Sequence, residues 1–453
     1  MNHAIILAAG KGTRMKTELP KCAFPLLAKP MVEYLIDALE KVSIDKIICV
    51  VGYKRDVMAN ILGDRVIYAV QEEQLGTGHA VKCAKELVEG DGYTIILPGD
   101  TPLIDEEILN AMIEKHIRKG NDFTIGTIKM DNPFGFGRIL RNMDGKIYSI
   151  VEEKDATEEQ KLIKEINTGL FCVNNKLLFE ALEKVDNNNA KGEYYLTDIV
   201  EILSSKAKIG SFTIRDAYKL RGINDLWALS EVESELRKAI NKKHMQNGVN
   251  MINPDTTTIS PNTIIEPGTT IYPGCMIMGD TVIGKDCIIG PNTELMNAVI
   301  EDNVKCKHSV VYDSKIMIGA TVGPFAHLRA DTVVGPGDRI GNFVEIKNST
   351  LGEKTNVAHL TYIGDTTCGS QVNWGCGTVT VNYDGKNKYK TKIGDKVFIG
   401  CNTNLIAPVV VDSESFIAAG STITNNVEKG EFAIARAKQI NKEDYAKKYG
   451  FKK

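Results

Sequence analysis

From residue 259 to residue 423, an aliphatic residue returns at nearly every sixth position. A period of six fits neither an α-helix, which repeats every 3.6 residues, nor an ordinary strand, which repeats every 2. A parallel β-helix has this period, because each flat side of a coil takes one hexapeptide and directs one aliphatic side chain toward the axis. The spacing predicts roughly nine stacked coils of three hexapeptides each. The expected inward positions are Ile259, Ile265, Ile271, Ile277, Ile283, Ile289, Leu295, Val304, Val310, Ile316, Val322, Leu328, Val334, Ile340, Ile346, Leu351, Val357, Ile363, Ile393, Ile399, Leu405, Val411, Ile417 and Ile423.

Residues 1 to about 226 show a different pattern, in which short β-branched runs alternate with amphipathic stretches. The runs predict strands at 4–7, 46–51, 66–70, 94–97, 123–128 and 169–173, and the amphipathic stretches predict helices at 31–42, 77–89 and 106–119. This alternation is typical of a mainly parallel sheet with helices on both faces. Ligands of such sheets bind at the carboxyl ends of the strands.

Residues 225–246 are predicted to form a helix, because apolar residues recur there at helical spacing: Leu226, Leu229, Val232, Leu236 and Ile240. The expected domains are therefore 1–226, a linker helix at 227–247, and a β-helix with a tail at 248–453. The charged tail, residues 441–453, is predicted to be helical or partly disordered.

Composition narrows the class of protein. The chain has 453 residues, of which 43% are hydrophobic and 25% charged, enough for two or three domains with cores. A net charge of −3 argues against a nucleic-acid partner. The sequence has neither a membrane-length apolar stretch nor the charged start of a signal peptide, so we expect a cytoplasmic protein without membrane association. Its ten cysteines lack metal-binding spacing and are expected to be reduced and structural, as at Cys275, Cys287 and Cys306 within the repeats.

The first predicted strand leads into the string IILAAGKGTRMKTELPKCAFPL. Its glycine-rich loop would let backbone N–H groups approach phosphate oxygens, and Arg14 and Lys21 would add positive charge. Two other phosphate-binding motifs are absent, since GxGxxG would need glycine where Met15 stands and no GxxxxGK[ST] string occurs. The whole string resembles the nucleotidyltransferase family that makes nucleotide sugars.

The resemblance continues in family order through QEEQLGTGHA, the Gly99–Asp100 pair, GFGRI, VEEKDA, EINTG and RGIND. It implies that Asp100 and Asn224 bind Mg²⁺, which prefers oxygen ligands. It also implies that a sugar-1-phosphate oxygen attacks the α-phosphate of a nucleoside triphosphate, with Arg14 and Lys21 as catalytic cations. The implied residues for UTP and the sugar nucleotide are Leu7, Ala8, Ala9, Gly10, Lys21, Gln71, Gly76, Thr77, Gly137, Glu152, Asn167 and Asn224.

The repeat region carries a second set of polar motifs, FVEIKN, VAHLTYIGD and an insertion that interrupts the repeat, VNWGCGTVTVNYDGKNKYKT. A loop that leaves a rigid scaffold often carries function. These motifs resemble the acetyltransferase half of the bacterial bifunctional family of N-acetylglucosamine-1-phosphate uridylyltransferases and glucosamine-1-phosphate N-acetyltransferases. The resemblance covers nearly the whole chain.

This resemblance implies a Rossmann-like nucleotidyltransferase domain and a left-handed parallel β-helix that forms homotrimers. The β-helix would acetylate glucosamine 1-phosphate with acetyl-CoA, with His359 as general base. The N-terminal domain would then convert N-acetylglucosamine 1-phosphate and UTP into UDP-N-acetylglucosamine, a cell-wall precursor, and pyrophosphate. Arg329, Lys347 and Lys388 would hold the sugar phosphate. The implied sugar site also includes Tyr362 and Asn373, and the acetyl-CoA site includes Asn382, Tyr383, Lys388, Cys401, Ala419 and Arg436.

Two residues depart from the family pattern, Pro98 in place of a usual Tyr and Cys401 in place of a usual Ser. Three other functions are compatible with the sequence. A single-activity nucleotidyltransferase would leave the motifs around His359 without a use, and a non-catalytic regulatory subunit would have no need of Arg14, Lys21 and Asp100. A uridylyltransferase for another sugar is not excluded by the sequence.

Overall fold

The computed structural model describes residues 1–448 and 450, and it divides into two compact units, Met1–Glu235 and Leu236–Lys453. The two units are described separately below. Within the described residues, no helix combines the length and apolar character needed to cross a membrane.

The first unit is built on a mixed sheet with the order β11-β7-β10-β6-β1-β4-β5. The predicted parallel arrangement is confirmed for its middle, where β1 pairs with both β4 and β6. One long strand, β10, runs antiparallel to its neighbours, and an unpredicted pair, β8 and β9, joins the sheet through it. The strands are β1 His3–Leu7, β4 Lys46–Val51, β5 Ile67–Val70, β6 Tyr93–Pro98, β7 Phe123–Lys129, β8 Arg138–Arg141, β9 Ile147–Val151, β10 Glu165–Asn174 and β11 Ile209–Thr213.

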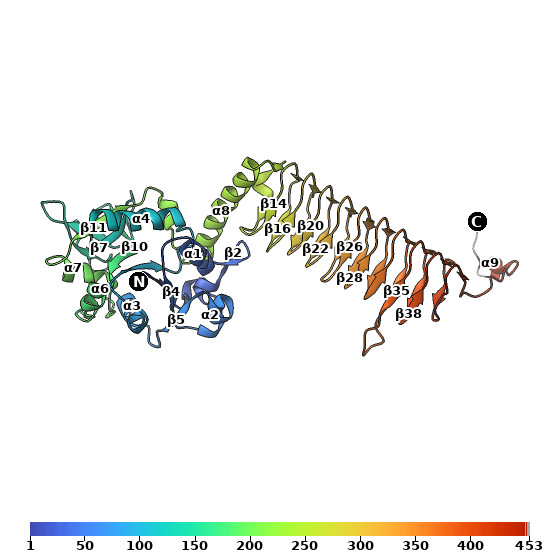
Figure 1. Ribbon diagram of the computed structural model, residues 1–453, viewed down its shortest axis with the longest axis horizontal. Helices are drawn as coiled ribbons and strands as arrows, with labels where there is room; N and C mark the ends of the chain where they lie inside the picture. The colour runs from blue at the N-terminus through green and yellow to red at the C-terminus, as the bar shows by residue number, and fades with distance from the viewer. Residues whose placement is uncertain (449, 451–453) are drawn as a thin grey trace. The chain divides into compact units, whose positions relative to one another are not determined.

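Helices cover both faces of this sheet, as the sequence predicts (Figure 1). One apolar cluster holds α1 (Met31–Leu39), α2 (Arg55–Leu62) and α4 (Glu106–Lys119) against one face. A second cluster holds α3 (Thr77–Lys82), α6 (Asn175–Leu182) and α7 (Ile199–Leu203) against the other. Two helices end earlier than predicted: α1 stops at residue 39, and after α3 the chain continues as a 3-10 turn, Lys85–Leu87.

The predicted helix at 225–246 is α8, Leu226–Gln246. Its residues belong to both units, because the division between them falls after Glu235. Near its end the buried Asn241 donates side-chain hydrogen bonds to the carbonyls of Pro254 (2.8 Å) and Thr257 (2.9 Å). These bonds satisfy carbonyl groups at the start of the coil, where there is no preceding coil to bond them.

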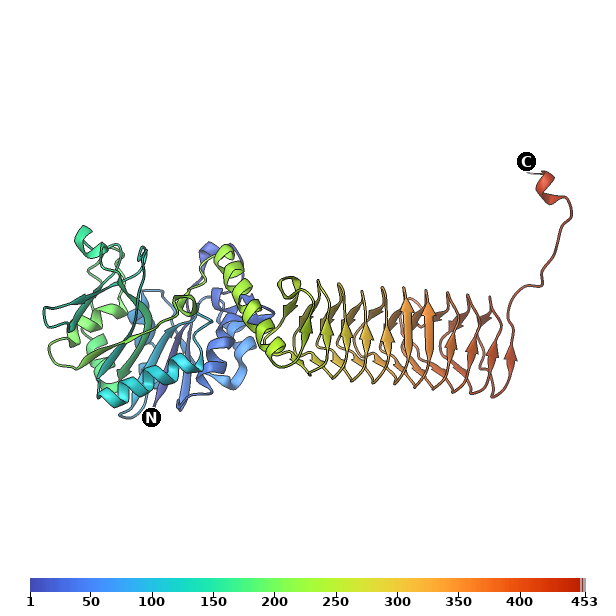
Figure 2. The same ribbon diagram turned by 90° about the horizontal axis from the view of Figure 1, so that it is seen from above.

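The second unit is the predicted parallel β-helix. Its described residues form three parallel sheets of 11, 10 and 9 short strands, from β12 (Asn250–Met251) to β41 (Phe432–Ala433). Figure 2 shows successive strands stacked along the coil. The interior is one continuous cluster of mainly aliphatic side chains that also contains Trp374, Cys368 and the three predicted cysteines, Cys275, Cys287 and Cys306, so the expected structural role of these three agrees with their burial.

One of the predicted inward positions is wrong. In β22 (Val310–Tyr312) the inward side chain is Val311, and Val310 is only half-buried. Val304 is fully buried in the core as predicted, beside Cys306 of β21 (Lys305–Cys306). The reason is a change in coil length. Ile277 pairs with Leu295, which is 18 residues later, but Leu295 pairs with Val311, which is only 16 residues later. Two sides of this coil take five residues, and a strict six-residue count loses phase there.

After β41 the chain leaves the coil and forms a last helix, α9 (Tyr445–Lys448). The predicted helical character of the tail agrees with α9 over those residues. Residues 441–444 and 450 are not helical, and the rest of that prediction, at residues 449 and 451–453, lies outside the described residues.

Candidate functional site

The loop after β1 folds back onto Lys21. The end of β1 is held on both sides, since the Ala8 amide donates to the Val50 carbonyl and the Gly99 amide donates to the Leu7 carbonyl, each at 3.0 Å. Gly12 has a φ of +66°, and a Cβ placed there would lie 2.6 Å from the Cβ of Lys21. Only glycine therefore allows this close return of the chain.

Four predicted residues from distant parts of the sequence meet beside this loop. The Lys21 ammonium bonds both the Asp100 carboxylate and, at 2.7 Å, the side-chain oxygen of Asn224. Arg14 also donates to that Asn224 oxygen at 2.7 Å. Asn224 is brought here because the Ile223 amide bonds the Asp100 carbonyl at 2.9 Å. The two expected metal ligands and the two expected cations thus form one cluster.

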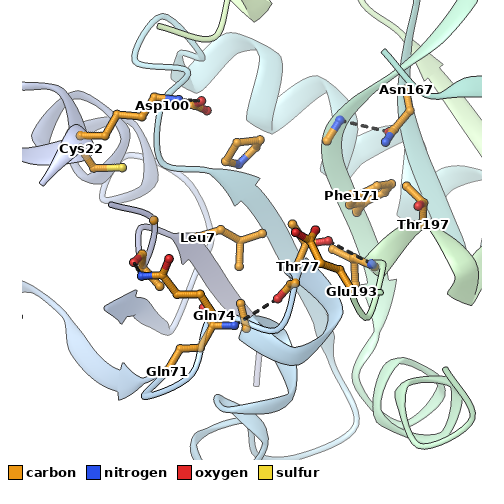
Figure 3. Close-up of a pocket in the computed structure, with 18 of the residues that line it drawn as sticks. Leu7, Cys22, Gln71, Gln74, Thr77, Asp100, Asn167, Phe171, Glu193 and Thr197 are labelled. Carbon is orange, nitrogen blue, oxygen red and sulfur yellow. Dashed lines mark hydrogen bonds and ion pairs between the residues drawn. The ribbon is translucent and has the colours of Figure 1, made fainter. Parts of the chain in front are cut away.

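This cluster lies at one side of a cavity of about 440 Å³ at the carboxyl ends of the strands. Figure 3 shows Asp100 and Cys22 on one side, Asn167, Phe171 and Thr197 on the opposite side, and Gln71 and Gln74 at one end. The predicted residues that line the cavity are Leu7, Ala9, Gly10, Lys21, Gln71, Gly76, Thr77, Asp100, Glu152 and Asn167.

Four predicted residues do not line the cavity. Ala8 packs into the core instead, because successive side chains of an extended chain point to opposite faces. Gly137 lies behind the wall, where its carbonyl accepts the Asn167 amide at 2.8 Å. Arg14 and Asn224 reach the lining only through the contacts described above. Sequence reasoning missed several residues of the wall, namely Cys22, Gln74, Ala80, Gly169, Phe171, Glu193, Leu196 and Thr197.

One end of the cavity is shaped by the turn that precedes α3. The Gln71 side chain donates to the Gly76 carbonyl at 3.1 Å, and the Gln74 side chain donates to the Ala9 carbonyl at 2.9 Å. Gly76 has a φ of +115°, and a Cβ there would lie 2.6 Å from the carbonyl oxygen of Tyr194. The turn is therefore docked against residues 193–196, which explains why those residues line the same cavity.

The opposite end contains polar groups beside an irregularity in the sheet. The pairing of β10 with β7 is interrupted between Asn167 and Phe171, and the Asn167 side chain accepts the Gly169 amide at 3.0 Å. The nearby Glu152 accepts a hydrogen bond from Thr197 at 3.1 Å, and burial raises the pKa of its carboxyl group. This end offers hydrogen-bond donors and acceptors suited to a polyhydroxylated ligand.

In the second unit, His359 lies at the end of β30 (Asn356–His359). It pairs with Asn342, the last residue of β27 (Arg339–Asn342), one coil earlier. The His359 Nδ1 lies 2.7 Å from the side-chain oxygen of Asn342, and the His359 ring is exposed. Since Asn342 accepts the Nδ1 proton, Nε2 is free to accept another. Sequence reasoning missed Asn342, because it stands 17 residues away and only the coil register pairs it with His359.

Three predicted cations are grouped on a neighbouring side of the coil. The Lys388 ammonium lies against that of Lys347 and lowers the pKa of Lys347, and the charge of Arg329 adds to the effect. Arg329 is paired with Glu345 at 2.8 Å. Like charges gathered in this way are stabilised by an anion, so the group suits a phosphate.

The insertion after β34 (Val379–Val381) supplies Lys388 to this group. The insertion forms a small hairpin in which Tyr383 pairs with Lys388. At its base Asn382 is buried and donates to the Asp365 carboxylate. A Cβ placed on Gly364 would lie 2.5 Å from the Tyr362 hydroxyl and 2.7 Å from the Asn382 side chain, so Tyr362 and Asn382 meet above that glycine. Asn373 is not brought to them, because it belongs to a different sheet of the coil.

The remaining predicted residues stand at a corner of the coil farther along the chain. Cys401 and Ala419 are exposed there on successive coils, and Arg436 donates to the Ala419 carbonyl at 2.8 Å. The exposed thiol of Cys401 contrasts with the buried cysteines of the coil interior.

Comparison with known proteins agrees with this division of chemistry. The nucleotidyl transferase family model matches residues 3–228, and the bacterial transferase hexapeptide model (six repeats) matches residues 262–297 and 390–425. The fold and the two groups of polar residues thus define a nucleotidyl transferase joined to a hexapeptide-repeat transferase.

Relatives match this chain along its whole length. The bifunctional protein GlmU of Acholeplasma laidlawii is 55% identical over 98% of this chain and 97% of its own. The bifunctional protein GlmU of a Geobacillus species is 49% identical over 100% of this chain and 99% of its own, and that of Clostridium novyi is 48% identical over 99% of each.

The chain therefore belongs to the bifunctional GlmU family. It is a bifunctional enzyme of UDP-N-acetylglucosamine synthesis, with a uridylyltransferase and an N-acetyltransferase activity. The alternative of a single activity beside a purely structural coil is thereby set aside, as is that of a regulatory subunit without catalysis.

Proposed function

We propose that the cavity of the first unit is the uridylyl-transfer site and that its residues act as the sequence implies. The observation that carries this proposal is the meeting of Arg14, Lys21, Asp100 and Asn224 at one side of the cavity. UTP would lie along the loop after β1, with its base toward Gln71 and the Gly76–Thr77 turn. The sugar of N-acetylglucosamine 1-phosphate would lie toward Glu152 and Asn167.

In this proposal the sugar-phosphate oxygen attacks the α-phosphorus of UTP, the α–β bridging bond breaks, and pyrophosphate leaves. Both reactants are anions, so the main tasks of the protein are positioning and charge neutralisation. Arg14 and Lys21 supply fixed positive charge, while backbone N–H groups of the loop after β1 face the phosphates. The reaction needs no nucleophilic side chain.

Asp100 and Asn224 are proposed to hold Mg²⁺. Within residues 1–448 and 450, no group of three or more His, Cys, Asp and Glu side chains is placed to hold a metal by itself. The pair nevertheless fits Mg²⁺, which commonly takes one or two protein oxygens and completes its shell with phosphates and water. When bound, Mg²⁺ would neutralise charge on the phosphates. The Lys21 ammonium contacts both oxygens and would have to shift toward the phosphates as the ion binds.

We propose that acetyl transfer takes place at the corner of the β-helix that carries His359 and on the adjacent side, which carries Arg329, Lys347 and Lys388. The amine of glucosamine 1-phosphate would attack the thioester carbonyl of acetyl-CoA, forming an amide and releasing the CoA thiol. Nε2 of His359 would accept the amine proton, while Asn342 holds Nδ1. Arg329, Lys347 and Lys388 would bind the phosphate, and Tyr362 would lie beside the sugar. Cys401, Ala419 and Arg436 would contact acetyl-CoA, with Asn382 and Tyr383 at the adjacent hairpin.

We further propose that the enzyme is a cytoplasmic homotrimer. Beside the corner of the coil that carries His359, the side chains of Phe325, Phe343 and Leu360 are 56%, 55% and 56% exposed. The two phenyl rings are stacked with centroids 5.5 Å apart, and all three residues have positive φ, an uncommon conformation for bulky residues. Contact with a second copy of the chain would bury this apolar column. Asn373, which lies on a different sheet from Tyr362, would then be available to the site of a neighbouring subunit.

The test of the uridylyl-transfer site is the substitution Asp100→Ala, with Asp100→Asn as a matched variant of similar size. Both should abolish formation of UDP-N-acetylglucosamine from UTP and N-acetylglucosamine 1-phosphate, because each removes the carboxylate. Acetylation of glucosamine 1-phosphate should be unchanged, since the two sets of residues share no member. Loss of both activities in a folded variant, or full uridylyl transfer, would contradict the assignment. Replacing N-acetylglucosamine 1-phosphate with glucose 1-phosphate in the same assay tests the alternative sugar.

A further inference from the structure

The His359 corner continues along the coil as a column of four residues. Val357 pairs with Trp374, Trp374 pairs with Ile399, and Ile399 pairs with Ile417 on successive coils. The residue two positions after each of these four stands at the corner of its coil. The four corner residues are therefore in register, in the order His359, Cys376, Cys401 and Ala419. The insertion after β34 hides this relation in the sequence, because it separates the two cysteines by 25 residues.

The backbones that carry Cys376 and Cys401 are in direct contact. The Asn402 amide donates to the Cys376 carbonyl at 2.7 Å. A Cβ placed on the preceding Gly375 would lie 2.5 Å from the Cys401 nitrogen. Paired residues of neighbouring strands stand about 4.8 Å apart. That separation falls within the range of about 4.4–6.8 Å between the Cα atoms of a disulfide.

These two thiols differ from the other cysteines in accessibility. Cys401 is exposed and Cys376 is half-buried, whereas every other cysteine except Cys83 is buried. Burial raises the pKa of Cys306 and of Cys368 to about 12 and also raises that of Cys22 in the uridylyl-transfer cavity. The buried thiols are therefore protected both by lack of access and by lack of the reactive thiolate form.

We propose that Cys376 and Cys401 form a dithiol that a small-molecule disulfide oxidises to an intramolecular disulfide, and that this oxidation stops acetyl transfer. One thiol would attack the small-molecule disulfide, form a mixed disulfide and release one reagent thiol. The second thiol would then attack the mixed disulfide at the protein sulfur and release the other reagent thiol. The two protein thiols are oxidised, the reagent is reduced to two thiols, and the two thiol protons end on the released thiols.

The consequence for activity rests on the proposed acetyl-transfer site. Cys376 stands one coil from His359 in the same column, and Cys401 belongs to the proposed acetyl-CoA contacts. A bond between their sulfur atoms would occupy the corner through which the thioester must reach the base. Among the described residues, the buried Cys22 is the only cysteine that lines the uridylyl-transfer cavity, so uridylyl transfer should not respond.

The experiment uses the full-length enzyme incubated with oxidised glutathione. We expect a Cys376–Cys401 linked peptide in non-reducing mass spectrometry, lighter by two hydrogens than the reduced pair. Acetyl transfer should fall to the blank rate, uridylyl transfer should be unchanged, and dithiothreitol should restore the lost activity. Each variant is compared with its own reduced form. Cys376→Ala and Cys401→Ser should resist inactivation, while the matched control Cys83→Ser should respond like the wild type.

Three results of this experiment would each overturn a part of the proposal. Absence of the linked peptide, or glutathione adducts without it, would overturn the dithiol. A complete Cys376–Cys401 link with acetyl transfer retained would overturn the switch and place the error in the proposed acetyl-transfer site. Inactivation that persists in both the Cys376→Ala and the Cys401→Ser variant would assign the effect to other groups.

Discussion

The proposed role of His359 as a base depends on a residue of the preceding coil. The side-chain oxygen of Asn342 accepts a hydrogen bond from Nδ1 at 2.7 Å, which leaves Nε2 to act as the base. His359→Ala should lower the rate of CoA release with glucosamine 1-phosphate by roughly 10²–10⁴-fold, the range of a positioned general base. Uridylylation of supplied N-acetylglucosamine 1-phosphate should not change. If the His359→Ala variant acetylates within a few-fold of the wild-type rate, the role of His359 is structural.

A buried carboxylate, Asp338, links the stability of the coil to pH. It is fully buried, and its two oxygens accept the Gly335 and Thr355 amides at 2.7 Å each. Burial nevertheless raises its pKa to about 6, above the usual value for Asp. The folded state therefore holds the proton more tightly than the unfolded chain. The stability that this proton provides is complete below about pH 4 and is lost as the pH rises through about 6.

Asp338→Asn tests this linkage. The carboxamide would place N–H groups against a backbone N–H group, and this contribution of about 1–3 kcal/mol does not itself change with pH. The advantage of the wild type over this variant should be largest near pH 4 and should shrink by up to about 3 kcal/mol by pH 7. Thermal melting of both proteins at pH 4, 5.5 and 7 measures the difference. A pH-independent difference would show that Asp338 does not titrate in this range.

At the scale of elements, the uridylyl-transfer cavity depends on the interruption in β10. Gly169 has a φ of +78°, and a Cβ there would lie 2.8 Å from Cγ of Pro98 at the end of β6. Gly169→Ala should therefore displace the Asn167 loop and raise the KM for N-acetylglucosamine 1-phosphate, while acetyl transfer stays unchanged. Positive φ at alanine should itself cost about 1 kcal/mol of stability. The measurement is uridylyl-transfer kinetics with the sugar phosphate varied.

The matched control for this contact is Gly145→Ala in the turn between β8 and β9. Gly145 has a similar φ of +76°, but a Cβ there would meet nothing within 4 Å. The Gly145→Ala variant should be less stable than the wild type, but its KM for N-acetylglucosamine 1-phosphate should be unchanged. Adding Pro98→Ala to Gly169→Ala should recover part of the lost affinity, because it removes the ring that the new methyl group meets. Equal kinetics for the Gly169 and Gly145 variants would exclude the contact as the cause.

At the scale of the whole molecule, light scattering should report three times the chain mass of 49.8 kDa. The proposed seam is the apolar column of Phe325, Phe343 and Leu360. Phe343→Asp should weaken assembly, because it would place a charge against apolar surface at the interface. Acetyl transfer should fall with the trimer, whereas uridylyl transfer should persist. A monomeric wild type with full acetyl transfer would contradict a site shared between subunits.

The sequence by itself determined both kinds of fold and the chemistry of each half. A six-residue period has few physical solutions, and buried parallel strands between amphipathic helices are almost as distinctive. The string from Ile5 to Leu26, and the motifs that follow in order, indicated the positions of Lys21, Asp100 and the other predicted ligands. Such features are local, because each depends on residues that are near one another along the chain.

Only the tertiary structure decided which residues meet. A coil shortened to 16 residues moved an inward position from Val310 to Val311 and placed Cys306 in the core beside Val304, and no local pattern predicts that change. Gln74 and Thr197 joined the cavity wall through the docking of a turn against a distant loop. Asn342 met His359, and Cys376 aligned with Cys401, because stacking brings together residues that are one whole coil apart. The number of residues in one coil varies along the β-helix, so these pairings follow from the fold and not from the six-residue period.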